Sequence, residues 1–292
     1  MGAMLETRRA LRGKKFDVVL NMHASMSANL ISMMISSERK IGFDKERSRD
    51  KQHLFCNEFI PAKKNQHVAD GMVDFVNHLT NKNGHPVWEP LNLNPEEDEI
   101  KKYIDENKVT CLISPCSSQR YGKKYNRSWS IENFIEVIKY LLGQKNAQVI
   151  ITGGLSETEV EYSKKIDAEN FSEDFVNLIG KTSIRGMAAL VKHSQFIISP
   201  DSGPAHIGTV MNKPVIGLYA MSNLNRSGPY YSGKWTIDKY PEALETFEGK
   251  NIESSKWGQK VKDPDAMQLI KVNDVISKID GVISYVNKRH QD

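Results

Sequence analysis

The chain has 292 residues, of which 39% are hydrophobic and 26% charged, and its formal net charge is +4 at pH 7. This composition is typical of a globular protein with a core, and no apolar stretch approaches the roughly 20 residues that a membrane-spanning helix needs. Residues 1–17 lack the apolar block typical of a secretory signal, and the three cysteines form no Cys-x-x-Cys pair, so we expect a cytoplasmic protein without a cysteine-based zinc site. The sequence contains no arginine-rich tract with interleaved aromatic residues, so no nucleic-acid partner is expected.

The first part of the chain alternates short β-rich runs with helical patterns. Residues 16–20 (FDVVL) and 39–43 (RKIGF) are predicted strands, and helical patterns run to about Ile35 and over residues 66–80. Residues 44–65 are polar and are predicted to form a surface loop. An α/β domain usually opens with a strand and a glycine-bearing turn, whereas this chain opens in a basic, helix-like stretch. We therefore expect an incomplete N-terminal domain.

The second part of the chain shows a cleaner alternation of strands and amphipathic helices, which is typical of a parallel sheet covered by helices. The predicted strands are residues 108–114, 147–154, 176–180, 195–199 and 214–220. The predicted helices are residues 94–107, 131–143, 156–166, 184–193 and 272–289, the last of which should close the fold. The sequence thus predicts an α/β protein with Rossmann-like domains over residues 1–93 and 94–275 and a closing helix over residues 276–292.

Polar side chains follow several of the predicted strands. In open parallel sheets, ligands bind beyond the carboxyl ends of the strands, where helix N-termini point their amides at anions. After the strand at residues 108–114, Ser117 and Ser118 offer hydroxyl groups, and Arg120 and Arg127 offer positive charge, although a basic loop can also be merely solvated.

Two further turns offer weaker signals. After the strand at residues 147–154, Glu157 or Glu159 can accept hydrogen bonds from a ribose, or these acids can simply cap the following helix. Thr182 or Ser183 is predicted to cap the helix over residues 184–193.

The densest polar motif is DSGPAH, directly after the strand at residues 195–199. Ser202 is predicted to cap a helix, and Pro204 suits its first turn. Gly203 leaves room for an anion, which His206 can reach from one turn further along. In the alternative interpretation, Asp201 and Ser202 only cap the helix and His206 lies in the core. Capping does not explain the glycine and the histidine together, so we favour an anion-binding site.

Other chemistries lack their signals. The sequence contains no G-x-S-x-G, Walker A or G-x-G-x-x-G motif, and no cluster with the spacing of metal ligands. Hydrolase, nucleotide triphosphatase and dehydrogenase functions are therefore disfavoured, and no metal is expected.

Residues 201–230 resemble the sugar-nucleotide signature of the glycosyltransferase family that contains the lipopolysaccharide heptosyltransferases. The resemblance continues through CSSQR and NRSW, the GG-x-x-E turn, FDVVLNMHAS and RKIGF, and SPCSSQR is similar to the heptosyltransferase I branch. It implies a GT-B fold, in which two Rossmann-like domains face a cleft. It also implies inverting, metal-independent transfer of heptose from ADP-L-glycero-D-manno-heptose to Kdo–lipid A, without a cofactor.

The resemblance also implies which residues bind the donor. They are Ser117, Ser118, Arg127, Glu157, Asp201, Ser202, Gly203 and His206. By this likeness the two serines bind the diphosphate, with Arg127 in the place of a phosphate-binding lysine. Glu157 holds the ribose and Asp201 contacts the heptose, while the last three residues hold the diphosphate and the sugar.

The acceptor side is less defined. His23, Ser25 and Arg120 are candidates for contact with the acceptor. The family's general base is an aspartate that follows an N-terminal strand and glycine turn, and this sequence shows no counterpart. The alternatives are therefore a nucleotide-sugar-binding protein without turnover, or a GT-B transferase for another nucleotide sugar. An acyl-anchored acceptor implies peripheral contact with the cytoplasmic face of the inner membrane.

Overall fold

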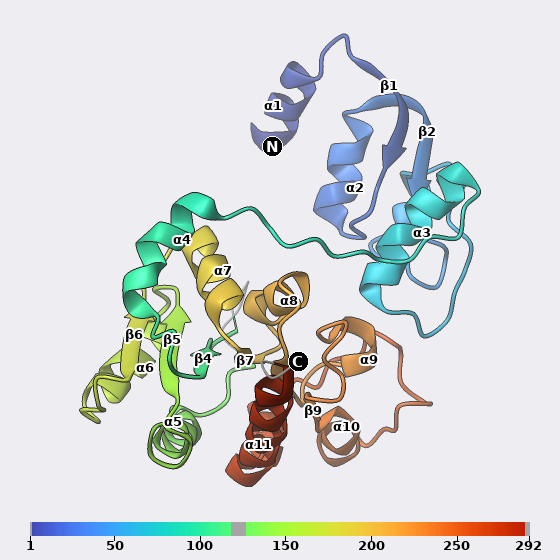
Figure 1. Cartoon of the computed structure of the whole chain (residues 1–292). Helices are drawn as coiled ribbons and strands as arrows, with labels where there is room; N and C mark the ends of the chain where they lie inside the picture. The colour runs from blue at the N-terminus through green and yellow to red at the C-terminus, as the bar shows by residue number, and fades with distance from the viewer. Residues whose placement is uncertain (1, 118–126, 290–292) are drawn as a thin grey trace. The chain divides into compact units, whose positions relative to one another are not determined.

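The computed structural model describes residues 2–117 and 127–289, which form two compact units, Met1–Val87 and Trp88–Asp292 (Figure 1). We call them the N-terminal and the C-terminal unit. Both are built from parallel strands and helices, so the predicted α/β class is confirmed. The domain boundaries that the sequence predicts at residues 93 and 275 stay predictions.

The N-terminal unit holds a three-stranded parallel sheet in the order β1-β2-β3. Its strands are β1 (Lys15–Leu20), β2 (Ser36–Gly42) and β3 (Glu58–Phe59). Its helices are α1 (Gly2–Ala10), α2 (Met26–Met33), the 3-10 turn η1 (Gln52–Leu54) and α3 (Val68–Thr80). A small core of Ile41, Ile60 and Phe75 holds these elements together. The first two strands and the helix α3 confirm the sequence predictions for this region.

The prediction of a plain surface loop over residues 44–65 is wrong. This segment contains η1 and β3, and Gln52 is fully buried. The Gln52 amide donates to the carbonyl oxygen of Asn21 at 2.9 Å, and its Oε1 accepts from the backbone N–H of Phe43 at 3.1 Å. One buried side chain therefore connects the ends of β1 and β2, and nothing in the polar composition of the segment indicates this.

The C-terminal unit holds a six-stranded sheet in the order β6-β5-β4-β7-β8-β9, with every pair parallel. The strands are β4 (Thr110–Ile113), β5 (Gln148–Gly153), β6 (Phe175–Ile179), β7 (Phe196–Pro200), β8 (Val215–Tyr219) and β9 (Ile237–Asp238). After β4 the chain adds β5 and β6 on one side, and after β7 it adds β8 and β9 on the other side. The neighbours β4 and β7 therefore mark the topological switch point, where open sheets bind ligands.

Helices cover both faces of this sheet (Figure 1). They are α4 (Asn94–Ile100), α5 (Ile131–Lys145), α6 (Glu157–Asp167), α7 (Ile184–His193), α8 (Gly203–Val210), α9 (Leu224–Ser227), α10 (Tyr240–Glu248) and α11 (Val272–Arg289), with 3-10 turns η2 (Lys101–Tyr103) and η3 (Pro264–Leu269). Because side chains alternate along a strand, Cys111 and Ile113 face a core with α5, α6, α10 and α11, whereas Leu112 faces a second core with α4, α7 and α8. The helix α11 closes the first core, as predicted.

The helix predicted over residues 94–107 is shorter than expected. It ends at Ile100 and continues only as η2. The buried side chain of Gln148 explains the ending, because it donates to the Tyr103 carbonyl at 3.0 Å and accepts from the Asp105 N–H at 3.0 Å. The Tyr103 carbonyl and the Asp105 N–H are therefore hydrogen bonded to a side chain of β5 and do not form the bonds that would extend the helix.

Helix α8 packs very closely on the sheet at Gly208. A Cβ atom at this position would lie 2.4 Å from Val215 Cγ2 and 2.9 Å from Ile197 Cδ1. Since α8 begins directly beyond β7, this close approach fixes where the start of α8 lies relative to the switch point.

Gly208→Ala is expected to destabilise the C-terminal unit by about 1–3 kcal/mol, because the added methyl group overpacks the helix–sheet contact. Gly143→Ala is the matched control: it lies at an exposed site in α5 where a Cβ meets nothing within 4 Å. It should stabilise the unit by about 0.5–1 kcal/mol. Urea unfolding followed by tryptophan fluorescence measures both, since all 4 tryptophans lie in this unit. Shifts of the same sign would contradict the packing.

Candidate functional site

An ion pair lies beyond the carboxyl ends of β4 and β7. The Arg127 guanidinium donates from Nη1 to Asp201 Oδ2, which joins the segment after β4 to the residue directly after β7. The Asp201 side chain is 11% exposed and that of Arg127 is 23% exposed. The structure thus brings together two of the predicted donor-binding residues at the switch point.

The backbone around Arg127 is held firmly in place. Its N–H donates to Ser117 Oγ at 3.1 Å, and the Ser117 N–H donates to Ser128 Oγ at 3.0 Å. Trp129, two residues after Arg127, is fully buried, and its indole N–H donates to the Ile270 carbonyl at 3.0 Å. Ser117 therefore lies beside Arg127, as predicted. Ser118 and Arg120 fall outside the described residues.

Asp201 has two further polar neighbours that the sequence prediction missed, and one of them is a hydrogen-bond partner. Ser222 Oγ donates to Asp201 Oδ2 at 2.6 Å, whereas the Tyr219 phenol, which donates to the Ser227 carbonyl at 3.4 Å, lies near the same carboxylate. Burial raises the pKa of Tyr219 well above its ordinary value, and the Asp201 carboxylate adds to the shift, so the phenol remains a hydrogen-bond donor. Their position at the carboxyl end of β8, next to β7, is the signal that would have found both residues.

The DSGPAH turn differs in detail from its prediction. Ser202 occupies the N-cap position of α8, but its hydroxyl makes no capping bond and instead lies 2.8 Å from Ser199 Oγ, so the predicted side-chain cap is wrong. Pro204 lies in the first turn, as expected. His206 is exposed, which excludes its placement in the core. A Cβ at Gly203 would meet no heavy atom of the described residues within 4 Å, so packing within them does not require a glycine.

The glycine turn after β5 separates the two candidate glutamates. Glu159 forms a capping box with Ser156 and accepts from the Gly154 N–H at 2.6 Å, so its carboxylate serves the start of α6. Glu157 is exposed, and no hydrogen bond or ion pair joins its carboxylate to another described residue. Of the two, Glu157 remains available to a ribose. Ser183 caps α7, as predicted.

Two of the predicted acceptor residues, His23 and Ser25, lie beyond the carboxyl end of β1 in the N-terminal unit. His23 is exposed, and its Nδ1 lies 2.8 Å from Ser25 Oγ. Ser25 caps α2 by accepting from the Ala28 N–H at 3.3 Å. The structure thus brings His23 and Ser25 together.

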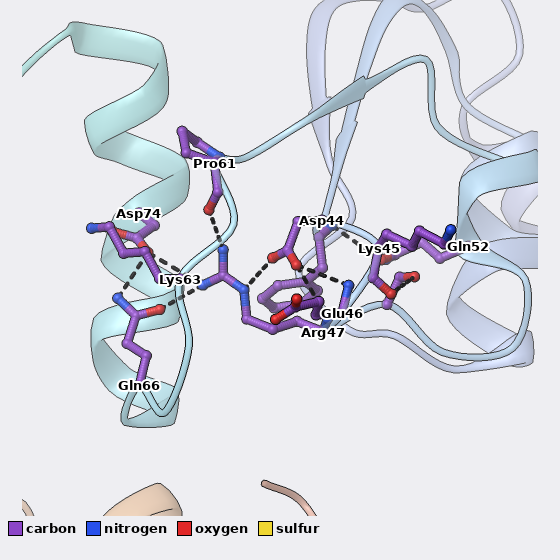
Figure 2. A network of polar contacts seen from close by, with 11 residues as sticks. Asp44, Lys45, Glu46, Arg47, Gln52, Pro61, Lys63, Gln66 and Asp74 are labelled. Atoms are coloured by element: carbon purple, nitrogen blue, oxygen red, sulfur yellow. Dashed lines mark hydrogen bonds and ion pairs between the residues drawn. The ribbon is translucent and has the colours of Figure 1, made fainter. Parts of the chain in front are cut away.

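A second polar cluster lies beyond the carboxyl ends of β2 and β3, with Arg47 at its centre (Figure 2). The guanidinium contacts the Asp44 carboxylate, Gln66 Oε1 at 2.5 Å, Asp74 Oδ2 at 3.3 Å and the Pro61 carbonyl at 2.6 Å. The side chains of Asp44 and Asp74 are only 7% and 5% exposed. The cluster connects the segments that follow β2 and β3 with α3. Sequence analysis missed it because a run of mixed charges is typical of a solvated loop.

The electrostatics of this cluster centre on Asp74. Burial by itself raises the pKa of this carboxyl, but hydrogen bonds from Lys63, Gln66 and Arg47 outweigh burial, and the pKa is lowered. Lys63 Nζ approaches Asp74 Oδ1 to 2.7 Å. Asp74 is therefore ionised at neutral pH and is stabilised by its partners in that form.

The C-terminal unit is a doubly wound, Rossmann-like α/β unit with a cation and a helix start at the switch point of its sheet. The family model for glycosyltransferase family 9 (heptosyltransferase) matches residues 4–255. The lipopolysaccharide core heptosyltransferase OpsX of Haemophilus influenzae is 35% identical over 280 residues, which cover 94% of this chain and 78% of that protein. The chain therefore belongs to glycosyltransferase family 9, the heptosyltransferases, as the sequence resemblance predicts.

Solved structures agree on the fold. A glycosyltransferase family 9 protein from Veillonella parvula superposes with a TM-score of 0.69 at 18% identity, over 97% of this chain and 78% of that chain. Escherichia coli heptosyltransferase WaaC with ADP gives a TM-score of 0.64 at 17% identity, over 96% of this chain and 77% of that chain. The predicted α/β class with parallel sheets thus matches the GT-B-like structures of this family.

Arg47→Ala is expected to destabilise the N-terminal unit by about 3 kcal/mol at pH 7, because it removes a cation that the buried carboxylates of Asp44 and Asp74 share. The pKa of the Asp74 carboxyl is lowered in the folded protein. This carboxylate therefore stabilises the fold at pH values above the pKa of an aspartate in the unfolded chain, about 3.9, and the stabilisation is lost as the pH falls below that value. The effect of the substitution should therefore shrink below about pH 4.

Urea-dependent amide hydrogen exchange in β2 measures this local stability. Lys15→Ala, which removes the exposed pair with Glu38, is the control and should cost less than about 1 kcal/mol. An Arg47→Ala effect of equal size at pH 7 and pH 3 would contradict the role of the carboxylates.

Proposed function

We propose that the chain transfers L-glycero-D-manno-heptose from ADP-heptose to the Kdo–lipid A inner core of lipopolysaccharide. The observation that carries this proposal is the Arg127–Asp201 pair at the switch point. A guanidinium is suited to a diphosphate, and a carboxylate is suited to sugar hydroxyls. One pair therefore supplies the chemistry for both halves of a nucleotide sugar at the place where such sheets bind ligands.

The neighbouring residues fit the same ligand. Ser117, beside Arg127, and the amides at the start of α8 can donate to phosphate oxygens. No atom of the described residues would lie within 4 Å of a Cβ at Gly203, which leaves room for a phosphate close to the backbone, and the exposed His206 lies in the first turns of α8. Glu157 has a carboxylate available for the ribose hydroxyls. We retain Ser118 as a diphosphate ligand from the sequence resemblance alone.

The transfer itself requires that negative charge on the departing ADP be stabilised. In an inverting reaction, the acceptor hydroxyl attacks the anomeric carbon from the face opposite to the leaving diphosphate. Arg127 and the helix amides are fixed donors at the site where that charge develops, and such preorganised donors stabilise the transition state. The proposal therefore includes metal-independent transfer. The general base that activates the acceptor is not assigned.

The names of the relatives support the donor and the acceptor. The Haemophilus influenzae relative is named a lipopolysaccharide core heptosyltransferase, and the solved Escherichia coli structure is described as a heptosyltransferase with ADP. We assign the donor to the C-terminal unit and the acceptor to the N-terminal unit, where His23 and Ser25 are the candidate contacts.

A lipid-anchored acceptor would place the chain at the cytoplasmic face of the inner membrane as a peripheral protein. Among the described residues, no helix has the length and apolar character to cross a bilayer. Contact with the membrane surface is therefore part of the proposal and would occur without such a span.

Calorimetry with ADP and ADP-heptose tests the donor site. Arg127→Ala should weaken both ligands about tenfold to a hundredfold, because it removes a charged hydrogen bond to the diphosphate. Asp201→Ala should weaken ADP-heptose but leave ADP within a few-fold, since the carboxylate contacts only the sugar. Lys165→Ala, which removes an exposed pair with Glu132 in the same unit, should change neither affinity.

The other outcomes are equally informative. Unchanged affinities in both site variants would refute the donor site. Binding of ADP-heptose without transfer to Kdo–lipid A would identify a binding protein without turnover. Transfer from a different nucleotide sugar in a donor screen would correct the substrate.

A further inference from the structure

We propose that Ser222 is a positioning residue that holds the Asp201 carboxylate in place for the donor sugar. This inference rests on the proposed function, because it concerns the same donor site. It assigns a role to a hydroxyl group that neither the sequence motif nor the resemblance singles out.

The contact between the two side chains is short and buried. Ser222 Oγ donates to Asp201 Oδ2 at 2.6 Å. Counted over the whole residue, Ser222 is 3% exposed and Asp201 is 8% exposed, so little water competes for this hydrogen bond. A buried hydroxyl that donates to a carboxylate makes one of the stronger hydrogen bonds found in proteins.

The backbone of Ser222 is itself fixed. Ser222 forms an isolated antiparallel bridge with Lys260, and the Val261 N–H donates to the Met221 carbonyl at 3.1 Å. Met221 and Val261 are both almost fully buried. A distant segment of the chain therefore locks the turn after β8, so that the serine hydroxyl has a defined direction.

Ser222 and Arg127 share one oxygen of Asp201. Both donate to Oδ2, one from the turn after β8 and the other from the segment after β4. In the proposed function Arg127 binds the diphosphate, and its hold on the carboxylate then weakens. The Ser222 hydroxyl is neutral and has no part in binding phosphate. It therefore keeps the carboxylate oriented while Arg127 serves the diphosphate.

The consequence is selective for the sugar. Ser222 acts through Asp201, which contacts the heptose, so its loss should affect ADP-heptose and not ADP. Ser222→Ala should weaken ADP-heptose about tenfold in calorimetry and leave ADP within twofold. Ser222→Thr keeps a hydroxyl at the same carbon and should restore most of the affinity.

Ser194→Ala is the matched control in the same unit. It also removes a fully buried serine hydroxyl, which donates to the Leu190 carbonyl at 2.7 Å, at the end of α7 that precedes β7. It should leave both ligands unchanged. In the Asp201→Ala background, the Ser222→Ala change should add nothing further to the loss, because the group on which it acts is gone.

Three results would overturn the inference. The first is a parallel loss of ADP and ADP-heptose affinity in Ser222→Ala, and the second is an additional loss in the Asp201→Ala background; both indicate a purely structural role. The third is an unchanged ADP-heptose affinity in Ser222→Ala when the wild-type chain binds this ligand. If the wild-type chain binds ADP but not ADP-heptose, the proposed function itself fails and the inference falls with it.

Discussion

The pairing of β4 with β7 is the constraint on which the rest of the structure depends. The chain builds the sheet away from β4 in one direction and away from β7 in the other, so the segments that follow these two strands leave the sheet side by side. Only this arrangement lets Arg127 and Asp201, which are far apart in sequence, form an ion pair. The helix that starts beyond β7 adds its backbone amides at the same point. The anion-binding chemistry that we propose therefore depends on the topology of the sheet, and the side chains of Arg127 and Asp201 add to it.

The surrounding packing holds Arg127 and Asp201 in position relative to each other. On one side, buried Trp129 is hydrogen bonded to the segment before α11 and holds the chain next to Arg127. On the other side, Gly208 lets α8 approach the sheet, and the bridge from Ser222 to Lys260 fixes the turn after β8. Each contact joins the site to a part of the chain remote in sequence. The contacts that pack the core of this unit therefore also fix the positions of the residues at the site.

The sequence predicted those features whose cause is local. The strands β4 to β8 are continuous apolar runs, and the DSGPAH turn carries its chemistry in adjacent residues, so both were found, whereas the two-residue strand β9 was not predicted. The features that were missed depend on long-range hydrogen bonds. Gln52 and Arg47 organise the segment between β2 and α3 through backbone and carboxylate partners that leave no periodicity. Likewise, the hydroxyl of Ser222 acquires its role only because β8 lies beside β7.

A crystal structure of the chain with ADP-heptose tests the central claim most directly. The account predicts that the diphosphate lies beyond the carboxyl ends of β4 and β7, with Arg127 on its oxygens. It also predicts that a heptose hydroxyl lies on Asp201 while Ser222 keeps its hydrogen bond to that carboxylate. A donor bound elsewhere, with Arg127 and Asp201 still paired and out of its reach, would contradict the account.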